Sequence, residues 1–244
     1  MVGRNPRPPP QLKLKEKELM RKSFQLGGLI AGAILVAFGV AAIVMGFNGR
    51  STVSDSLKQE QIVGTPDMTP AGIRVAAQKA GLKNVSFPSC SVANEAVTSG
   101  ATARCFAQYM QIHALEATGG FVYAQMGQYL AKPGTPKSEL SPGGGTSNRQ
   151  YAQLDPKTKQ PMSNGARNVW ITETALTTAL NSSYMASQLA LFGIVVGIAL
   201  LLSGFGFAIL AIGGALRKRE SPTDAVADKR TPKAARPSAV VPTP

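Results

Sequence analysis

The feature that most constrains the fold is a long apolar run near the carboxyl end of the chain. It covers residues 187–216 and reads SQLALFGIVVGIALLLSGFGFAILAIGGAL, with no charge, amide or proline between Gln188 and Arg217. Roughly 20 apolar residues, each rising ~1.5 Å, are enough for a helix to cross a bilayer core. A soluble helix that is apolar on every face needs a large fold around it. We therefore predict a transmembrane helix rather than a buried core helix.

A second apolar run covers residues 24–47, FQLGGLIAGAILVAFGVAAIVMGF, with a single polar residue, Gln25, at its edge. A basic start followed by an apolar core also describes a signal peptide. This core is too long for one, and no small-x-small cleavage site follows it. We predict a first, uncleaved transmembrane helix, so that the chain crosses the membrane twice.

Positive charge is concentrated next to these two runs. The net charge is +13 over 244 residues; residues 1–23 carry seven Lys or Arg against two Glu, and residues 217–244 carry seven against three acidic residues. Basic residues flanking membrane spans mark cytoplasmic segments. We expect a plasma-membrane protein with two cytoplasmic tails, the first containing prolines and the second disordered, and with residues 48–186 outside.

The same charge distribution argues against nucleic acid as a partner. The tails lack the interleaved aromatic residues on which bases stack. Basic segments beside a membrane instead attract anionic lipid headgroups. Membrane lipid is therefore the expected partner of the tails.

Small residues recur in both apolar runs. Gly28 and Gly32 form one GxxxG pattern, and Gly193 and Gly197 form another. Small residues let helix backbones approach closely in a membrane. We expect the two helices to pack on each other, with homo-oligomerisation or docking to a protein partner as alternatives. Neither run contains an ionisable residue or proline, which favours a passive anchor over a transporter.

The external segment begins with a polar connection and then shows helix signals. Thr69 is a suitable cap, Pro70 suits the first helical position, and Gly81 ends the helix. A second helix is predicted to open at Cys105 and to end at Gly119–Gly120.

The rest of the external segment differs in composition along its length. Residues 121–131 predict a short helix. Residues 132–165 are dominated by Pro, Gly, Ser, Lys and Gln, which favours a mobile loop. From about residue 166, apolar residues including Trp170 recur at helical spacing and predict a helix that runs into the second span, with Trp170 packed on the external helices.

Cys90 and Cys105 lie in the segment expected outside, where oxidation is favoured. A disulfide between them would close a loop of about 15 residues and would contribute roughly 3 kcal/mol to the free energy of unfolding, by reducing the entropy of the unfolded chain. We predict this disulfide; two buried free thiols are the alternative. Metal binding by both cysteines and His113 would require a fourth ligand and reduced thiols.

No sequence pattern points to catalysis. The chain lacks a nucleophile elbow, a phosphate-binding loop and a clustered acid pair. Its single histidine, His113, is expected to pair with Glu116 one turn on; a general-base role would lack a nearby nucleophile. We therefore predict no catalytic, cofactor-binding or metal-binding residue, and no cofactor.

Three stretches resemble a group of actinobacterial membrane proteins with two transmembrane helices and no established function. They read STVSDSLKQEQIVGTPDM, HALEATGGFVYAQM and RNVWITETALTTALNSSYMASQLALFGIVVGIALL. Members of this group often carry the automatic name aromatic ring-opening dioxygenase. Non-haem iron oxygenases typically bind iron through two histidines and one carboxylate. A chain with one histidine does not supply that triad, so the resemblance implies the layout and no catalytic site.

The sequence thus predicts an all-α membrane protein with two transmembrane helices and a small, disulfide-linked helical domain between them. The leading functional hypothesis is a non-enzymatic structural or accessory component of a plasma-membrane or cell-envelope assembly. One alternative is an exported sensor or binder of an apolar ligand or lipid; another is an enzyme of unrecognised type. The binder's pocket would be formed by Phe106, Tyr109, Met110, Tyr123 and Tyr129.

Overall fold

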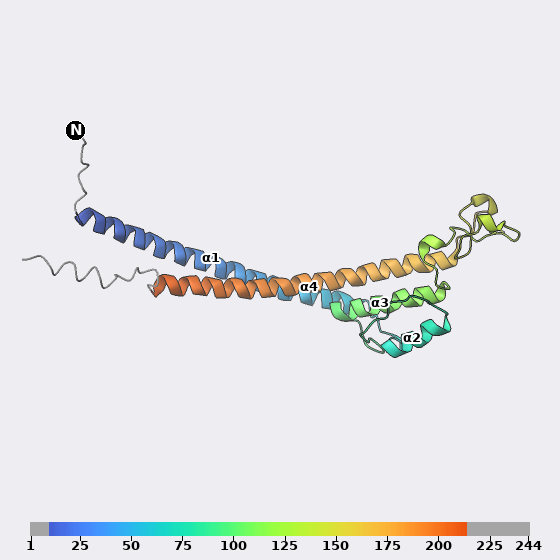
Figure 1. Cartoon of the computed structure of the whole chain (residues 1–244), viewed down its shortest axis with the longest axis horizontal. Coiled ribbons are helices and arrows are strands. Elements are labelled where there is room, and N and C mark those ends of the chain that lie inside the picture. The colour runs from blue at the N-terminus through green and yellow to red at the C-terminus, as the bar shows by residue number, and fades with distance from the viewer. Residues whose placement is uncertain (1–9, 214–244) are drawn as a thin grey trace, which may run out of the picture. The chain divides into compact units, whose positions relative to one another are not determined.

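The computed structural model describes residues 10–213, and the helices dominate it (Figure 1). The carboxyl-terminal tail, the last residues of the predicted second span and the first residues of the amino-terminal tail lie outside this range. Within residues 10–213 there is no strand, only isolated β-bridges, which confirms the all-α prediction for this part of the chain. The α helices are α1 (Pro10–Gln59), α2 (Pro70–Lys79), α3 (Gly100–Ala117) and α4 (Gly165–Ile212).

Two of these helices are long and apolar enough to cross a membrane. They are the Lys22–Gln59 part of α1 and all of α4, Gly165–Ile212. The first contains the whole apolar run of residues 24–47, and α4 contains residues 187–212 of the second run. Contacts divide the chain into two units, which we describe separately: residues 10–38 with 200–213, and residues 39–199.

The first helix is longer than the sequence analysis predicted. Residues 48–59, expected to be a polar connection, continue α1 without a break. Leu57 is buried in a hydrophobic core, with Val53 packed against the same core, so one face of this polar stretch is apolar. Asp55 and Lys58 form an ion pair of 3.4 Å on the exposed side. The connection is therefore an amphipathic end of the helix.

In the first unit, the two apolar helices make a close backbone contact at glycines. A Cβ atom added at Gly204 would lie 2.8 Å from the carbonyl oxygen of Gly32, and one added at Gly32 would lie equally close to that of Gly204. The contact at Gly28 is less close, since a Cβ atom added there would lie 3.4 Å from the Ala211 Cβ, an ordinary contact distance. Gly32 is therefore the closer contact of its GxxxG pair.

The second unit repeats this arrangement. A Cβ atom at Gly197 would lie 2.7 Å from the carbonyl oxygen of Gly39, and one at Gly46 would lie 2.6 Å from that of Ala190. Gly193 has more room, because its nearest neighbour would be 3.7 Å away. The sequence analysis thus named Gly197 but missed Gly39, Gly46 and Gly204, which are also buried.

The missed glycines follow a seven-residue repeat. In α1, Gly32, Gly39 and Gly46 are seven residues apart, and the repeat reaches Val53. A seven-residue hydrophobic repeat keeps one seam of each helix against the other and predicts a left-handed supercoil. We call this contact the small-residue seam. In α4 the glycine contacts place Ala190, Ile194, Gly197, Gly204, Ala208 and Ala211 against α1. The same seven-residue spacing of buried or half-buried positions continues along α4 to Leu180 and Glu173.

A hydrophobic core lies where the end of α1, α2, α3 and the Leu180 region of α4 meet. We name it the external core after the predicted location of residues 48–186. Its largest fully buried side chains include Tyr109, Met68, Ile73 and Ile112. Short extended segments before α2 and α3 close the core through backbone pairing, with Val97 N–H donating to the Ile62 carbonyl at 2.9 Å. All four helices therefore contribute to one small hydrophobic core, whose buried members are Leu57, Met68, Ile73, Ala77, Val92, Val97, Ala103, Cys105, Phe106, Ala107, Tyr109, Ile112 and Leu180.

The ends of the short helices follow local sequence signals. The Thr69 hydroxyl accepts a hydrogen bond from the Gly72 N–H, with Pro70 at the first helical position, as predicted. After α3, Gly119 and Gly120 both adopt positive φ, which confirms the predicted stop. The start of α3 differs: it begins at Gly100, before Cys105, because Ser99 and Thr102 form a capping box.

Residues 120–164, which we call the loop lobe, differ most from the sequence analysis. The helix predicted over residues 121–131 is reduced to a 3-10 turn at Tyr123–Gln125. The segment predicted to be a mobile loop, residues 132–165, contains turns and hydrogen bonds to distant backbone: Tyr129 and Thr146 exchange two backbone bonds of 2.9 Å. The buried Asn164 side chain donates to the Gly127 carbonyl at 3.0 Å. Pro and Gly here specify turns that bring these partners together.

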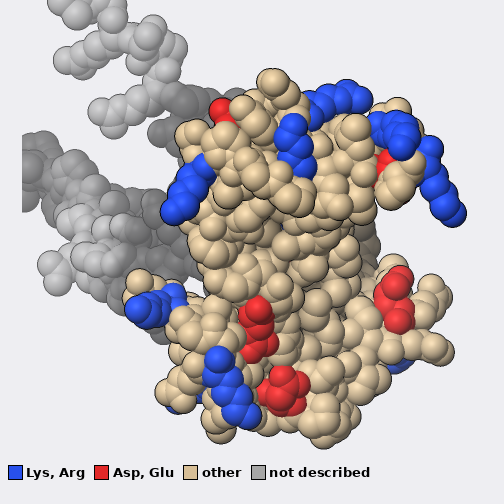
Figure 2. Space-filling model, turned by 90° about the vertical axis from the view of Figure 1, so that its right-hand side faces the viewer, with Lys and Arg blue, Asp and Glu red and all other residues tan. Residues whose placement is uncertain are grey.

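The loop lobe is basic. It carries five Lys or Arg against two acidic residues. Figure 2 shows Lys and Arg side chains gathered over the upper part of the face in view, where the lobe lies, and Asp and Glu side chains mostly below. Among the described residues, no carboxylate forms an ion pair with a lobe cation; Lys132 instead lies over the Tyr151 ring at 5.2 Å.

The small-residue seam predicts a position-specific effect of valine. Gly204→Val should lower the free energy of unfolding by about 1–3 kcal/mol, because the new side chain meets the backbone of α1. Gly206→Val is the matched control, since a Cβ at Gly206 meets nothing within 4 Å. Unfolding of both variants in mixed detergent micelles, followed by circular dichroism, checks this. Equal losses of unfolding free energy in the two variants would contradict the close backbone contact at Gly204.

Candidate functional site

The disulfide pair lies at one edge of the external core. The Cys90 and Cys105 sulfur atoms are at disulfide-bonding distance, 2.09 Å, with their Cα atoms 6.1 Å apart. One turn further along α3, the buried Tyr109 hydroxyl donates to the Cys90 carbonyl at 2.6 Å. The covalent bond and the hydrogen bond thus fix the same extended segment to α3.

Trp170 anchors the start of α4 to the end of α3. Its indole N–H donates to the Phe121 carbonyl at 2.8 Å, and lies 3.3 Å from the Thr118 hydroxyl. The ring is buried with Ala114 and Met126. The predicted packing of Trp170 on the external helices is confirmed.

The other end of α3 is held against α4 by a close glycine contact. A Cβ atom at Gly100 would lie 2.7 Å from the Ser187 Cβ and 3.0 Å from the Tyr184 Cα, so no other residue fits without movement. α3 therefore runs antiparallel to α4 and is fastened at Gly100 and near Trp170. Between these two contacts the helices leave space on both sides.

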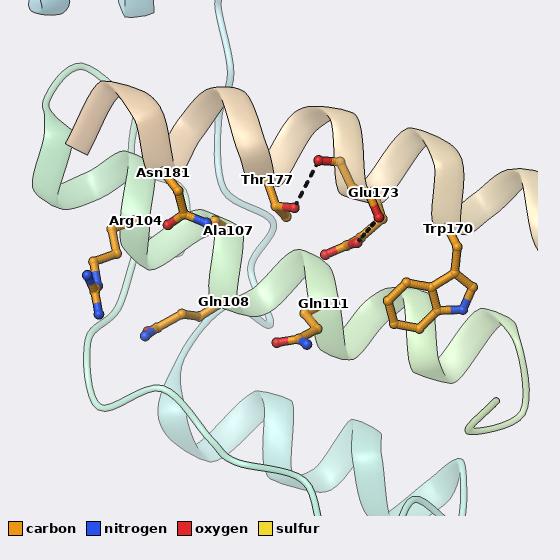
Figure 3. Close-up of a pocket in the computed structure, with 9 residues that line it drawn as sticks. Arg104, Ala107, Gln108, Gln111, Trp170, Glu173, Thr177 and Asn181 are labelled. Atoms are coloured by element: carbon orange, nitrogen blue, oxygen red, sulfur yellow. Dashed lines mark hydrogen bonds between the residues drawn. The ribbon is translucent and has the colours of Figure 1, made fainter. Parts of the chain in front are cut away.

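One of these spaces is a polar groove of about 430 Å³, which we call the amide groove (Figure 3). On α3 its residues follow a helical face at Arg104, Gln108 and Gln111. Figure 3 shows Asn181 and Thr177 opposite these side chains, with Trp170 at one end. The groove is lined by Arg104, Ala107, Gln108, Gln111, Trp170, Glu173, Thr174, Thr177 and Asn181.

Glu173 is the only carboxylate among the residues that line the amide groove, and it is buried, at 6% exposure. Its one hydrogen bond in the structure comes from the neighbouring Thr174 hydroxyl, at 3.3 Å. No ion pair joins it to a Lys, Arg or His among the described residues. The sequence analysis missed this residue, although a charge at a position of the seven-residue repeat is a visible signal.

The second space lies on the other side of the same contact and has a volume of about 440 Å³. Its walls are mostly apolar, and we call it the apolar groove. Glu173 lines this groove as well as the amide groove. The lining residues are Met110, His113, Ala114, Gly165, Asn168, Val169, Thr172 and Glu173.

His113 lies between two carboxylates. Its Nδ1 is 2.8 Å from Glu116, the predicted partner, and its Nε2 is 3.4 Å from an oxygen of Asp67. Only Nδ1 makes a hydrogen bond; Nε2 is buried and makes none with the described residues. Because both ring nitrogens face carboxylates, the arrangement ties the segment before α2 to α3.

The aromatic residues considered for an apolar pocket do not gather in one place. Phe106 and Tyr109 are buried in the external core, and Met110 lines the apolar groove. Tyr123 lies in the loop lobe with Arg167 4.1 Å from its ring centre, and Tyr129 pairs with Thr146. Core packing accounts for the two most buried of these side chains.

Metal ligands do not cluster in the described range: within residues 10–213, no three His, Cys, Asp or Glu side chains form a group that could hold a metal ion. Both cysteines are joined to each other. The amide groove and its buried carboxylate, Glu173, therefore form the candidate site, and binding of a polar ligand is the chemistry that they support.

The environment of Tyr109 predicts a pH-dependent stability. Burial, and then the negative charge of Asp67, raise the pKa of Tyr109 above its ordinary value. Above about pH 10 the unfolded chain therefore loses this proton before the folded chain does, and the free energy of unfolding falls as pH rises. Tyr109→Phe should remove this part of the slope, and should cost about 1 kcal/mol at neutral pH through the lost hydrogen bond.

Thermal unfolding of both proteins between about pH 8 and about pH 11 measures the difference, since the other titrating groups are common to both. If wild type and variant lost stability in parallel over this range, the inference that burial keeps the Tyr109 phenol protonated in the folded chain would be wrong.

Comparison with known proteins adds no relative to this description. The chain matches no protein-family model, no curated protein and no solved structure. The function is therefore argued from the residues and their geometry.

Proposed function

We propose that the chain is a non-enzymatic integral membrane protein, a structural or accessory component of a plasma-membrane or cell-envelope assembly. The observation that carries this proposal is the continuity of α4. One helix, Gly165–Ile212, contains both the apolar segment and one wall of the amide groove. A helix shared in this way supports a protein whose groove-bearing region is anchored to the membrane through α4.

The exposed surfaces of the two apolar segments support a membrane location. Large side chains such as Phe38, Phe192 and Phe205 are more than half exposed, while the small-residue seam faces inward. Contiguous apolar surface of this extent is rare on soluble monomers and marks contact with lipid or protein. Two helices that pack through small residues leave their large residues free for such a contact.

The proposed orientation places both termini in the cytoplasm and residues 48–186 outside. It is supported by the basic residues next to the two apolar segments. It is also consistent with the Cys90–Cys105 pair, since disulfides persist in oxidising compartments. The layout resembles that of actinobacterial proteins with two transmembrane helices.

An accessory role predicts a protein neighbour on one side of α4. Phe192 and Phe205 point to different flanks of the helix, because 13 residues at ~100° each leave them well over 90° apart. Replacing each phenylalanine in turn by a photoreactive phenylalanine derivative changes the side chain little. We expect ultraviolet irradiation of living cells to give a protein adduct of fixed mass from one position and not from the other.

Adducts are identified by mass spectrometry after extraction in mild detergent. Adducts with lipid alone at both positions, or a ladder of unrelated proteins at both, would contradict an accessory role. An adduct with a second copy of the chain would indicate a homo-oligomer rather than an accessory component bound to another protein.

A further inference from the structure

Glu173 presents an unusual electrostatic situation. Its carboxylate is nine-tenths buried at a position of the seven-residue repeat where apolar or small residues otherwise stand. A buried charge is costly unless it is paired and hydrogen-bonded. The only group that serves it in the structure is the hydroxyl of Thr174, which is neutral. A cation with several hydrogen-bond donors would complement this carboxylate.

The space beside Glu173 is preformed. Gly100 fixes one end of α3 against Tyr184 and Ser187, and the Trp170 indole fixes the other end through the Phe121 carbonyl. A groove fastened at both ends loses little conformational freedom when a ligand enters, which favours binding. Its volume of about 430 Å³ lies within the usual range for small-molecule sites.

The walls of the amide groove identify the body of the ligand. Gln108, Gln111 and Asn181 each offer an amide that donates and accepts, and Thr177 adds a hydroxyl. Such walls match a ligand that itself alternates donors and acceptors, as a peptide backbone does. An alkyl chain would leave these groups without partners, so a lipid tail is disfavoured in this groove.

Arg104 marks the far end of the groove. Its guanidinium lies 4.7 Å from the centre of the Tyr184 ring and is exposed, so it is available for an anion. Arg104 is seven residues from Gln111 on α3, or ~10.5 Å along the helix axis. Figure 3 shows Gln111 near Glu173 and Arg104 near Asn181. An extended chain covers ~3.3–3.6 Å per residue, so this separation corresponds to about three residues.

We propose that the amide groove binds a short zwitterionic peptide, of about three residues, with its ammonium group at Glu173 and its carboxylate at Arg104. The inference extends the proposed function from an accessory protein to one that carries a ligand outside the membrane. It rests on the groove alone. Crosslinking reports on a neighbour of the apolar segments and peptide binding reports on the groove, so each proposal fails separately.

Binding of trialanine to the full-length protein in mild detergent tests the proposal, with isothermal titration calorimetry as the readout. Unmodified trialanine should bind. Acetylation of its amino terminus should weaken binding about tenfold or more, because the charge-assisted bond to Glu173 is lost. No detectable binding of unmodified trialanine, or equal binding of the acetylated peptide, would overturn the proposal.

Substitutions test which residue binds each end of the peptide. The Glu173→Gln protein should bind trialanine about tenfold or more weakly than wild type does. It should also bind the acetylated and free peptides with equal affinity. Arg104→Gln should remove the preference for a free carboxylate over a carboxyl-terminal amide. Glu139→Gln, in the loop lobe, is the matched control and should bind as wild type does.

Folding of Glu173→Gln is checked by its thermal unfolding midpoint. The amide has the shape of the carboxylate and carries no charge, so the midpoint should be equal to or higher than that of wild type. A midpoint well below wild type would mean that Glu173 already has a stabilising partner within the protein, and would also overturn the proposal.

Discussion

The close approach of α1 and α4 through small residues is the contact on which the rest of the structure depends. Glycines at every seventh position remove the side chains that would hold the two backbones apart. In residues 39–199 the same seam continues out of the apolar segment to Leu180, where it joins the external core. The domain is therefore built on the ends of the helices that form the apolar pair, and does not need a large core of its own.

The change in chemistry along α4 explains where the grooves form. Towards the carboxyl end, the seam positions are small or apolar and the helices touch. Above Leu180, Glu173 stands at a position of the seven-residue repeat, and α3 contributes the small Ala107 and Ala114 to the two grooves that Glu173 lines. α3 is held at its two ends and leaves open the region between them. A buried polar group that breaks a local rule of packing is a frequent mark of function.

Local signals in the sequence were sufficient for some elements and not for others. Thr69, Pro70 and the Gly119–Gly120 pair act within a few residues, so the start of α2 and the carboxyl end of α3 were predictable. The loop lobe was not, because Tyr129 finds its partner Thr146 and Asn164 finds Gly127 only after distant turns bring them together. The grooves depend on the antiparallel placement of α3 along α4, which no stretch of sequence states. The seven-residue glycine repeat was visible but was interpreted through shorter GxxxG patterns.

The unbroken course of α4 sets a rule for its length. Each residue inserted or removed between Thr177 and Ser187 would turn the groove residues by ~100° about the helix axis relative to the seam below. Inserting or removing seven residues would return the groove residues almost to their original direction about the helix axis. Inserting or removing three or four residues would do so only partly. The distance along α4 between the groove residues and the small-residue seam can therefore vary between homologous chains only in steps of about 10 Å, which keep the two sets of residues on the same relative faces.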